Sequence, residues 1–181
     1  QTDFVNPVGR GEMDRNTDRM LSMVDAAVAG SAPFLPVRLV VFPEFAHAAP
    51  VFATVEELLE KLAVPIPNEH TGRMIDKARE HGVYIQMGSM LEVDPRWPGR
   101  VFNTSCLVGP EGLLSKYRKV NPWIPYEVHS SPHDVPGYDD RVPPGLHEPW
   151  VTPCSYVQVE MLDPAWRIGS VRGMFPWPAP H

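Results

Sequence analysis

Three stretches of the chain have the spacing of apolar residues that is typical of helices. In residues 13–29, apolar side chains recur at intervals of three and four, which places them on one helical face ahead of Gly30. Residues 54–63 begin with a threonine that is followed three positions later by a glutamate, the pattern of a capping box. Residues 69–81 end at Gly82, a common C-terminal cap. The face of the first predicted helix is formed by Met20, Val24, Ala27 and Val28.

Four other stretches predict strands. Residues 38–42 and 83–87 are short apolar runs of the kind that buried strands show. Residues 101–108 and 113–119 flank Gly-Pro-Glu-Gly at 109–112, where proline in the second position and glycine in the fourth suit a β-turn and hence a hairpin. The predicted order is helix, strand, helix, helix, strand, strand, strand. Helices that alternate with apolar strands indicate an α/β layered domain.

The pattern weakens after residue 121. The first 120 residues contain 10 prolines, whereas the last 61 contain 12. Hydrophobic periodicity is weak in this second part, where only residues 156–161 have the pattern of a strand. The composition therefore predicts a change of structural character near residue 121.

Composition and charge exclude several classes of protein. The chain is 43% hydrophobic and 21% charged, as ordinary soluble globular proteins are, and its net charge of −6 argues against binding to nucleic acid. It lacks the run of about 18 apolar residues that a membrane span needs, and its first residues are not a signal peptide. Two cysteines make no disulfide framework, and no zinc-binding spacing is present. We therefore expect a cytoplasmic protein without a metal ion.

Three charged residues are candidates for catalysis. Glu44 follows an apolar strand directly, and open α/β sheets place their active sites at the carboxyl ends of strands, so it could be a general base. Lys119 ends the predicted hairpin and could stabilise an oxyanion. Glu127 lies among aromatic residues and prolines and could sit in a pocket. Taken alone, position and composition favour an exposed loop acid at 44 and at 127 and a solvated basic strand at 119.

The cysteines and histidines are weaker candidates. Cys106 lies in the middle of a predicted strand and is expected in the core, because free cysteine is among the most buried residue types. Cys154 has no basic neighbour or helix start that would lower its pKa. His47, three residues after the candidate base, could border the same cleft. A proline between His129 and His133 argues against one helical face carrying both.

Taken together, these pieces resemble the nitrilase superfamily of carbon–nitrogen hydrolases. The family has a strand-end Phe-Pro-Glu, a hairpin that begins with Asn-Thr and turns through Gly-Pro-x-Gly, a Tyr-Arg-Lys after it, and, in amidase-like branches, a second glutamate eight residues beyond that lysine. A Gly-Ser pair before the hairpin is also a family habit. The matching residues here are Phe42-Pro43-Glu44, Gly88-Ser89, residues 103–112, Tyr117-Arg118-Lys119 and Glu127.

The resemblance implies a fold and a mechanism. The fold would be part of a four-layer α-β-β-α sandwich, and the full-length family form would be a homo-oligomer. A cysteine thiolate would attack an amide or nitrile carbon while Glu44 moves protons, Lys119 stabilises the developing charge, and Glu127 positions substrate or holds the lysine and a water. The substrate would be a small-molecule amide or nitrile, and no metal or organic cofactor would be needed.

The nucleophile of that mechanism is not identifiable. Cys154 lies 35 residues beyond Lys119, a tolerable distance, but without the glycine-rich lead and the Tyr-Asp that surround the family's cysteine. Residues 167–169 read Arg-Ile-Gly, as they do ahead of the family's nucleophile, yet the position where cysteine would follow is Gly173.

The resemblance therefore divides the chain into a nitrilase-like portion, residues 1–140, and a divergent proline-rich tail, residues 141–181. Gln1 resembles the residue that closes the family's first strand, which would precede this chain. Three hypotheses for the tail stay open: a truncated or frame-shifted gene, a pseudoenzyme that binds without cutting, and a rebuilt site that uses Cys154. The alternative function is thus a non-catalytic α/β binding module or fragment, whose bare sheet would favour assembly or aggregation.

Overall fold

The computed structural model describes residues 6–123 and 127–138, and every helix and strand predicted within them is present. The second predicted strand runs five residues beyond its expected end at residue 87. The predicted strand at 156–161 lies outside the described residues. In chain order the elements are η1 (Arg10–Glu12), α1 (Met13–Ser31), β1 (Leu39–Val41), α2 (Val55–Lys61), α3 (Glu69–His81), β2 (Tyr84–Glu92), β3 (Phe102–Gly109), β4 (Gly112–Arg118) and η2 (Pro132–Asp134).

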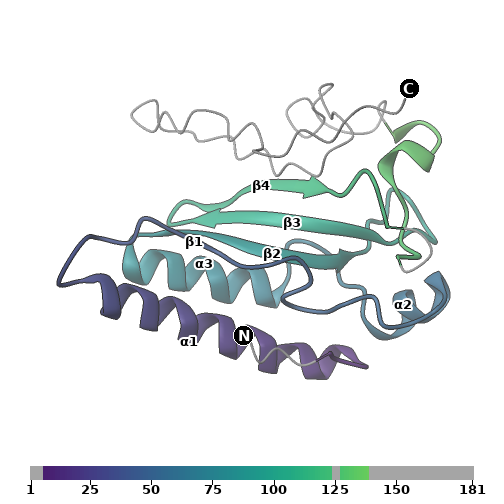
Figure 1. Cartoon of the computed structure of the whole chain (residues 1–181). Coiled ribbons are helices and arrows are strands. Elements are labelled where there is room, and N and C mark those ends of the chain that lie inside the picture. The colour runs from purple at the N-terminus through teal and green to yellow at the C-terminus, as the bar shows by residue number, and fades with distance from the viewer. Residues whose placement is uncertain (1–5, 124–126, 139–181) are drawn as a thin grey trace, which may run out of the picture.

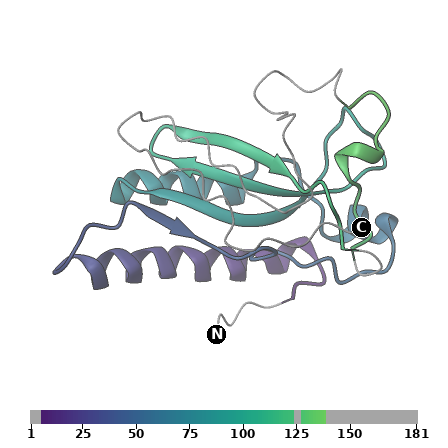
Figure 2. The same ribbon diagram turned by 45° about the horizontal axis from the view of Figure 1, so that its top comes forward.

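The strands form one four-stranded sheet in the order β1-β2-β3-β4. The first two are parallel, and β3 is antiparallel to both of its neighbours. Strands β1, β2 and β4 therefore run in the same direction, so their carboxyl ends meet at one end of the sheet, together with the beginning of β3 (Figures 1 and 2). The order of the strands thus gathers loops from distant parts of the sequence.

Helices α1 and α3 lie on the same side of the sheet (Figure 1), which confirms the α/β class. Their ends agree with the sequence signals: Asn68 caps α3 by accepting from the backbone N–H of Thr71 at 3.0 Å, and Gly82 ends it with a φ of 63°. Met20 and Val24 of the predicted apolar face are fully buried. Among the described residues, no helix has the length and apolar character needed to cross a membrane.

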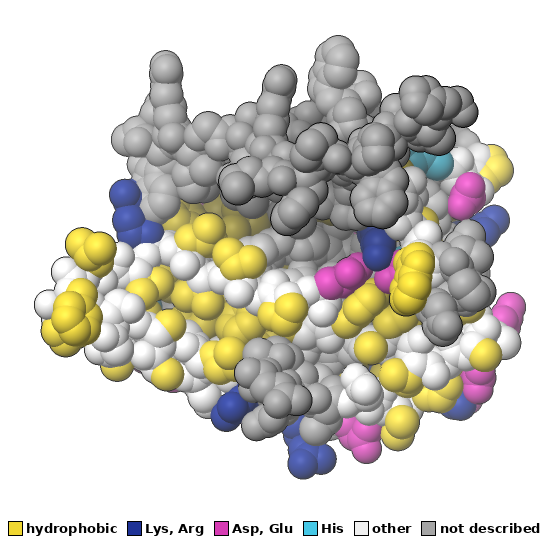
Figure 3. Space-filling view, viewed as in Figure 1, with side chains coloured by type: hydrophobic (Ala, Val, Ile, Leu, Met, Phe, Trp, Pro, Cys, Tyr) yellow, Lys and Arg dark blue, Asp and Glu magenta, His cyan; other side chains and the backbone are white. Residues whose placement is uncertain are grey.

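Apolar side chains are also exposed on the face seen in Figure 3, where they gather around α1 and the neighbouring edge of the sheet. Phe34 and Leu35, in the connection from α1 to β1, and Val41 at the end of β1 are among the exposed large apolar residues. Within the described residues β1 is an edge strand.

A bulge in β2 supports the loop that follows β1. The β2–β3 register shifts between Gln86 and Ser89, and Gly88, with a φ of 72°, lies so close to that loop that a Cβ atom there would be 2.1 Å from the carbonyl oxygen of Pro43. Ser89 then accepts a hydrogen bond of 2.9 Å from the backbone N–H of Phe45. In the bulge, Gly88 therefore leaves space for the loop because it has no side chain, and Ser89 binds the loop through a hydrogen bond.

A pair of buried histidines lies behind the same loop. His47 is fully buried, and neither ring nitrogen has a hydrogen-bond partner in the described part of the chain. Its ring contacts that of His70 at a tilt of 60°, with the ring centroids 5.4 Å apart, and the backbone carbonyl of His47 accepts a hydrogen bond from the side chain of Asn16. Burial, assisted by His70, lowers the pKa of His47 to about 3. His47 thus packs in the core between the loop and the helices, as a neutral side chain.

Replacing Gly88 by alanine is expected to destabilise the fold and displace the loop. The positive φ alone should cost about 1–2 kcal/mol in free energy of unfolding, and the approach to Pro43 should add about 1–3 kcal/mol. Gly99→Ala is a matched control, because Gly99 has a similar φ of 76° but nothing within 4 Å of its Cβ position. Urea unfolding of the two variants measures the difference, and equal losses of stability would contradict the close approach.

The histidine pair predicts acid sensitivity. Because the pKa of His47 is lower in the folded chain than in the unfolded chain, its contribution is fully present above the unfolded value near 6.5 and is lost as pH falls toward 3. The loss attributable to His47 should be about 4–5 kcal/mol over that interval. We expect His47→Leu to flatten the curve of unfolding free energy against pH. At pH 8 the unfolding free energy of the same variant measures the change in packing alone. If the variant and wild type lose unfolding free energy equally with falling pH below pH 6, the buried, neutral His47 is not the cause.

Candidate active site

The fold brings Glu44, Lys119 and Glu127 into contact. Glu44 follows the carboxyl end of β1, and Lys119 follows that of β4, at the same end of the sheet. The ammonium nitrogen of Lys119 lies 2.9 Å from Oε1 of Glu44 and 2.8 Å from each carboxylate oxygen of Glu127. All three charged residues singled out in the sequence therefore belong to one cluster, although 75 positions separate the first two.

Lys119 is held between the two carboxylates of this cluster. An ammonium group has three N–H donors, and the three contacts to the two carboxylates occupy them. Burial alone would lower the pKa of Lys119, but the hydrogen bonds from its ammonium to Glu127 and Glu44 outweigh burial and raise it. The lysine is thus a fixed positive charge, and its Nζ also lies 5.9 Å from the centre of the Phe45 ring.

Glu127 is the buried acid of the cluster, with 7% of the residue exposed. Its Oε2 also accepts a hydrogen bond from the backbone N–H of Trp123. Burial would raise the pKa of Glu127, but the hydrogen bonds from Lys119 and Trp123 prevail and lower it, so the carboxylate is ionised. Its segment is fixed nearby: the N–H of Ser130 donates to the carbonyl of Val101 at 2.7 Å.

Glu44 is the open acid of the cluster. Its side chain is 47% exposed, as expected if Glu44 were an ordinary acid in a surface loop. Its contacts, however, are those of an organised site. Asn103, at the beginning of β3, is buried and donates from Nδ2 to Oε1 of Glu44 at 2.7 Å. Within the described residues, Lys119 and Asn103 both donate to Oε1, and no donor lies on Oε2. In this part of the chain, one carboxylate oxygen is thus anchored by two donors and the other by none.

A buried ion pair in the neighbouring strands positions Lys119. Glu92, at the end of β2, is 1% exposed and accepts from Arg118 at 2.8 and 2.9 Å and from the hydroxyl of Thr104 at 2.6 Å. Lys116 pairs with the same carboxylate, and Arg118 also reaches Asp94 at 2.6 Å. Because side chains alternate along a strand, Arg118 points to one face of the sheet and the next residue to the other. Glu92 therefore fixes the strand from behind the site.

Sequence reasoning missed two features of the candidate site: Asn103, and the ion pair between Glu92 and Arg118 on the other face of the sheet. Asn103 entered the prediction only as part of a family motif, without a partner. The signal that could have found it was its position at the start of β3, a strand that lies between the strands whose ends carry Glu44 and Lys119.

Cys106 lies on the wrong side of the sheet to serve as a nucleophile for this cluster. Cys106 is three positions after Asn103 on β3, so the two side chains point to opposite faces of the sheet. Cys106 shares its face with Thr104 and the buried Glu92. It is 1% exposed in the hydrophobic core, as predicted, and burial raises the pKa of its thiol to about 12. Cys154 lies outside the described residues.

The remaining histidines differ in burial. His129 is buried, with its Nε2 4.0 Å from Oε2 of Glu127, whereas His133 is exposed in η2. His47 lies in the core with α1 rather than against the carboxylate of Glu44, as its contacts with Asn16 and His70 show.

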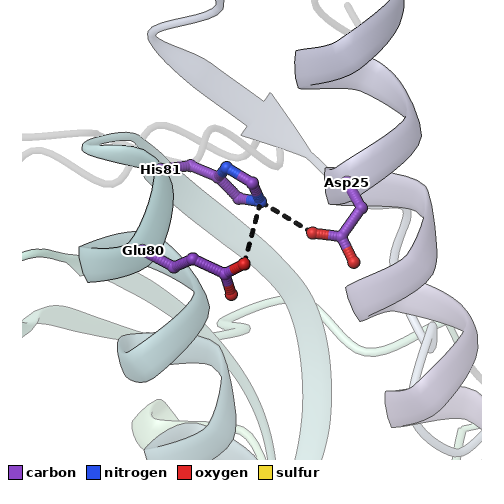
Figure 4. A group of neighbouring side chains, drawn as sticks. All are labelled: Asp25, Glu80 and His81. Atoms are coloured by element: carbon purple, nitrogen blue, oxygen red, sulfur yellow. Dashed lines mark hydrogen bonds and ion pairs between the residues drawn. The ribbon is translucent and has the colours of Figure 1, made fainter.

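Within residues 6–123 and 127–138, a separate group of potential metal ligands joins α1 to α3. Asp25, Glu80 and His81 lie with one ligand atom each within 4.8 Å of one another (Figure 4). His81 Nε2 lies 2.7 Å from Asp25, and the ammonium of Lys77 lies 2.9 Å from the same oxygen and 2.7 Å from Glu80. Because Lys77 already supplies the positive charge, we interpret this group as an ion-pair network between two helices.

Comparison with known proteins finds similarity in sequence and fold. A sequence model described as carbon–nitrogen hydrolase matches residues 8–159. Formamidases of Bacillus cereus and Bacillus anthracis are each 28% identical over 119 residues, covering 65% of this chain and 34% of theirs. The chain thus spans about a third of the length of these curated relatives.

Solved structures show the same fold at lower identity. An N-terminal amidase in complex with an Asn-Glu-Ala peptide superimposes with a TM-score of 0.53 at 22% identity, covering 67% of this chain and 28% of that one. A Saccharomyces cerevisiae member of branch 10 of the nitrilase superfamily has a TM-score of 0.52 at 19% identity, covering 66% and 42%. These likenesses establish the arrangement of helices and strands.

The two carboxylates should contribute unequally to stability. In double-mutant cycles with Lys119→Met, we expect a coupling energy of about 2 kcal/mol for Glu127→Gln, whose pair is largely buried. For Glu44→Gln we expect less than about 1 kcal/mol, because its half-exposed side chain is screened by solvent. Urea unfolding of the single and double variants gives both values. A larger coupling with Glu44 would show that Lys119 is held mainly from the open side.

Proposed function

This chain belongs to the carbon–nitrogen hydrolase family, and on that premise we propose that it belongs to an enzyme that hydrolyses the C–N bond of small amides at the Lys119 cluster. The observation that carries the proposal is one lysine ammonium held within 2.9 Å of two carboxylates, one open and one buried. An acid that can move protons beside a fixed positive charge is what acyl transfer requires.

Glu44 would be the general base and acid. Its Oε1 is anchored by Asn103 and Lys119, which leaves Oε2 to accept a proton without breaking either hydrogen bond. The half-exposed side chain would be accessible to a substrate. Geometry thus supports a base whose orientation is fixed before substrate arrives.

Lys119 would stabilise the negative charge that develops on the carbonyl oxygen. Its raised pKa keeps it charged during turnover. Glu127 would hold the lysine in place, because its buried carboxylate is ionised and accepts from the ammonium at both oxygens. In this proposal Glu127 acts on the reaction through Lys119.

The reaction would proceed through a thioester. A cysteine thiol loses its proton to Glu44, and its sulfur attacks the amide carbon. Glu44 returns that proton to the departing nitrogen, so ammonia leaves and an acyl-thioester remains. Water, deprotonated by Glu44, then attacks the thioester, which releases the carboxylic acid and restores the thiol.

The nucleophile of this scheme is not Cys106, whose thiol is buried and stays protonated. Cys154 is the other cysteine of this sequence and so the candidate to test. The formamidase relatives favour short amides over nitriles as the substrate class.

The proposal predicts ammonia release from formamide and acetamide by the purified chain. Glu44→Gln should lower the rate at least about a hundredfold, because general acid–base catalysis contributes that much or more. Glu60→Gln, a change of the same kind at an exposed position on α2, should leave the rate unchanged. Cys154→Ala should abolish turnover if Cys154 is the nucleophile.

Ammonia release is measured with a coupled enzymatic assay. Equal rates in wild type and Glu44→Gln would exclude the proposed base. A well-folded wild-type chain that releases no ammonia from either amide would favour the non-catalytic binding module instead.

A further inference from the structure

His129 is a buried polar side chain that no part of the proposed reaction yet uses. Its side chain is fully buried, and neither ring nitrogen has a hydrogen-bond partner within the described residues. Its Nε2 lies 4.0 Å from Oε2 of Glu127, which is too long for a hydrogen bond. The imidazole therefore stands directly behind the buried acid without binding it.

An unpaired imidazole in this position is costly. A buried donor or acceptor that lacks a partner forfeits the hydrogen bonds it made to water in the unfolded chain. Burial lowers the pKa of His129 to about 4, while the charge of Glu127 opposes that shift, so the ring is neutral near pH 7 and carries one N–H. An apolar residue of similar size would fill the space without this cost. His129 would avoid the cost in an arrangement of the neighbouring side chains in which its N–H makes a hydrogen bond.

Lys119 indicates what that arrangement is. Its three donors are all engaged, one with Glu44 and two with the oxygens of Glu127. To bind the oxygen of a substrate, the ammonium must withdraw at least one of these N–H groups. Oε2 of Glu127 is the oxygen best able to release it, because the backbone N–H of Trp123 also donates there and His129 stands beside it.

We propose that His129 is a positioning residue that donates its Nε2–H to Oε2 of Glu127 when Lys119 turns one N–H from that oxygen toward the substrate. The inference rests on the proposed function, because it needs a substrate that Lys119 contacts. The exchange moves no proton between groups: one hydrogen bond to Glu127 breaks, another forms, and the carboxylate stays ionised.

The backbone beside His129 is held by a hydrogen bond, so the proposed exchange would involve side chains alone. The neighbouring Ser130 is tied to Val101 by a hydrogen bond of 2.7 Å, which holds the segment in place. Closing the gap from 4.0 Å then needs only a small rotation of the imidazole or of the carboxylate. The charged groups that act on the ring are Glu127, Lys119 and Glu44, all members of the same cluster.

Three substitutions at His129 separate this role from a structural one. Glutamine places an N–H near the position of Nε2, asparagine places one near Nδ1, and phenylalanine fills the space with no donor. We expect His129→Gln to retain most of kcat for formamide. His129→Asn and His129→Phe should lose roughly ten- to hundredfold in kcat with little change in KM, the loss expected for one hydrogen bond to a charged group.

Thermal unfolding of the same variants controls for packing. His129→Phe removes two unpaired buried nitrogens, so its midpoint should equal or exceed that of wild type while kcat falls. A wild-type kcat in folded His129→Phe would overturn the proposal, and so would equal losses in the glutamine and phenylalanine variants.

A second measurement does not require turnover, so it distinguishes failure of this inference from failure of the proposed function. Lys119→Met removes the competing donor, and the ring should then close on Glu127. Nuclear magnetic resonance of nitrogen-15-labelled histidine in the full chain should show a downfield, slowly exchanging Nε2–H for His129. The signal should be absent from wild type and from Lys119→Met/Glu127→Leu, in which position 127 has no side-chain acceptor. If Lys119→Met folds and lacks this signal, His129 does not bind Glu127 and the proposal fails, whether or not the chain hydrolyses amides.

Discussion

The arrangement of the site depends on a carboxylate that lies on the other face of the sheet. Glu92 is almost fully buried, and removing such a group from water costs several kcal/mol unless charged partners surround it. Arg118 and Lys116 of β4 supply those partners across the intervening strand β3. Burial would raise the pKa of Glu92, but these contacts lower it, so the carboxylate is ionised. Because the ion pair spans three strands, it fixes how far β4 extends along β2 and thus where Lys119 emerges.

Much of the fold could be predicted from local signals. The caps of α3 and the alternation of β3 and β4 are determined by neighbouring residues, and the structure follows them. The end of β2 was predicted too early, at residue 87, because Gly88 reads as a strand terminator when neighbours along the chain are considered alone. The strand continues because β3 pairs beyond the bulge, from Ser89 to Glu92, and the partners in this pairing are ten or more positions away along the chain.

The site was predictable in its members but not in its contacts. Position at the end of a strand suggested Glu44 and Lys119, and the surrounding aromatic residues and prolines suggested Glu127, before the family resemblance added to all three. Sequence could not show that Glu44 is the exposed acid and Glu127 the buried one, since exposure depends on packing between segments that are distant along the chain. It also gave His129 no role, because a lone histidine in a proline-rich loop has no periodic pattern that places it.

The approach of Gly88 to Pro43 makes the loop that carries Glu44 a composite of two distant segments. Backbone from one segment occupies the space that a side chain would take in the other, and Ser89 completes the joint through its hydroxyl. Grafting this loop onto another scaffold would therefore require both segments, because Phe-Pro-Glu alone would lack the contacts that Gly88 and Ser89 make with the loop. For the same reason, a search for shared ancestry at this loop should examine the two segments as one inherited unit.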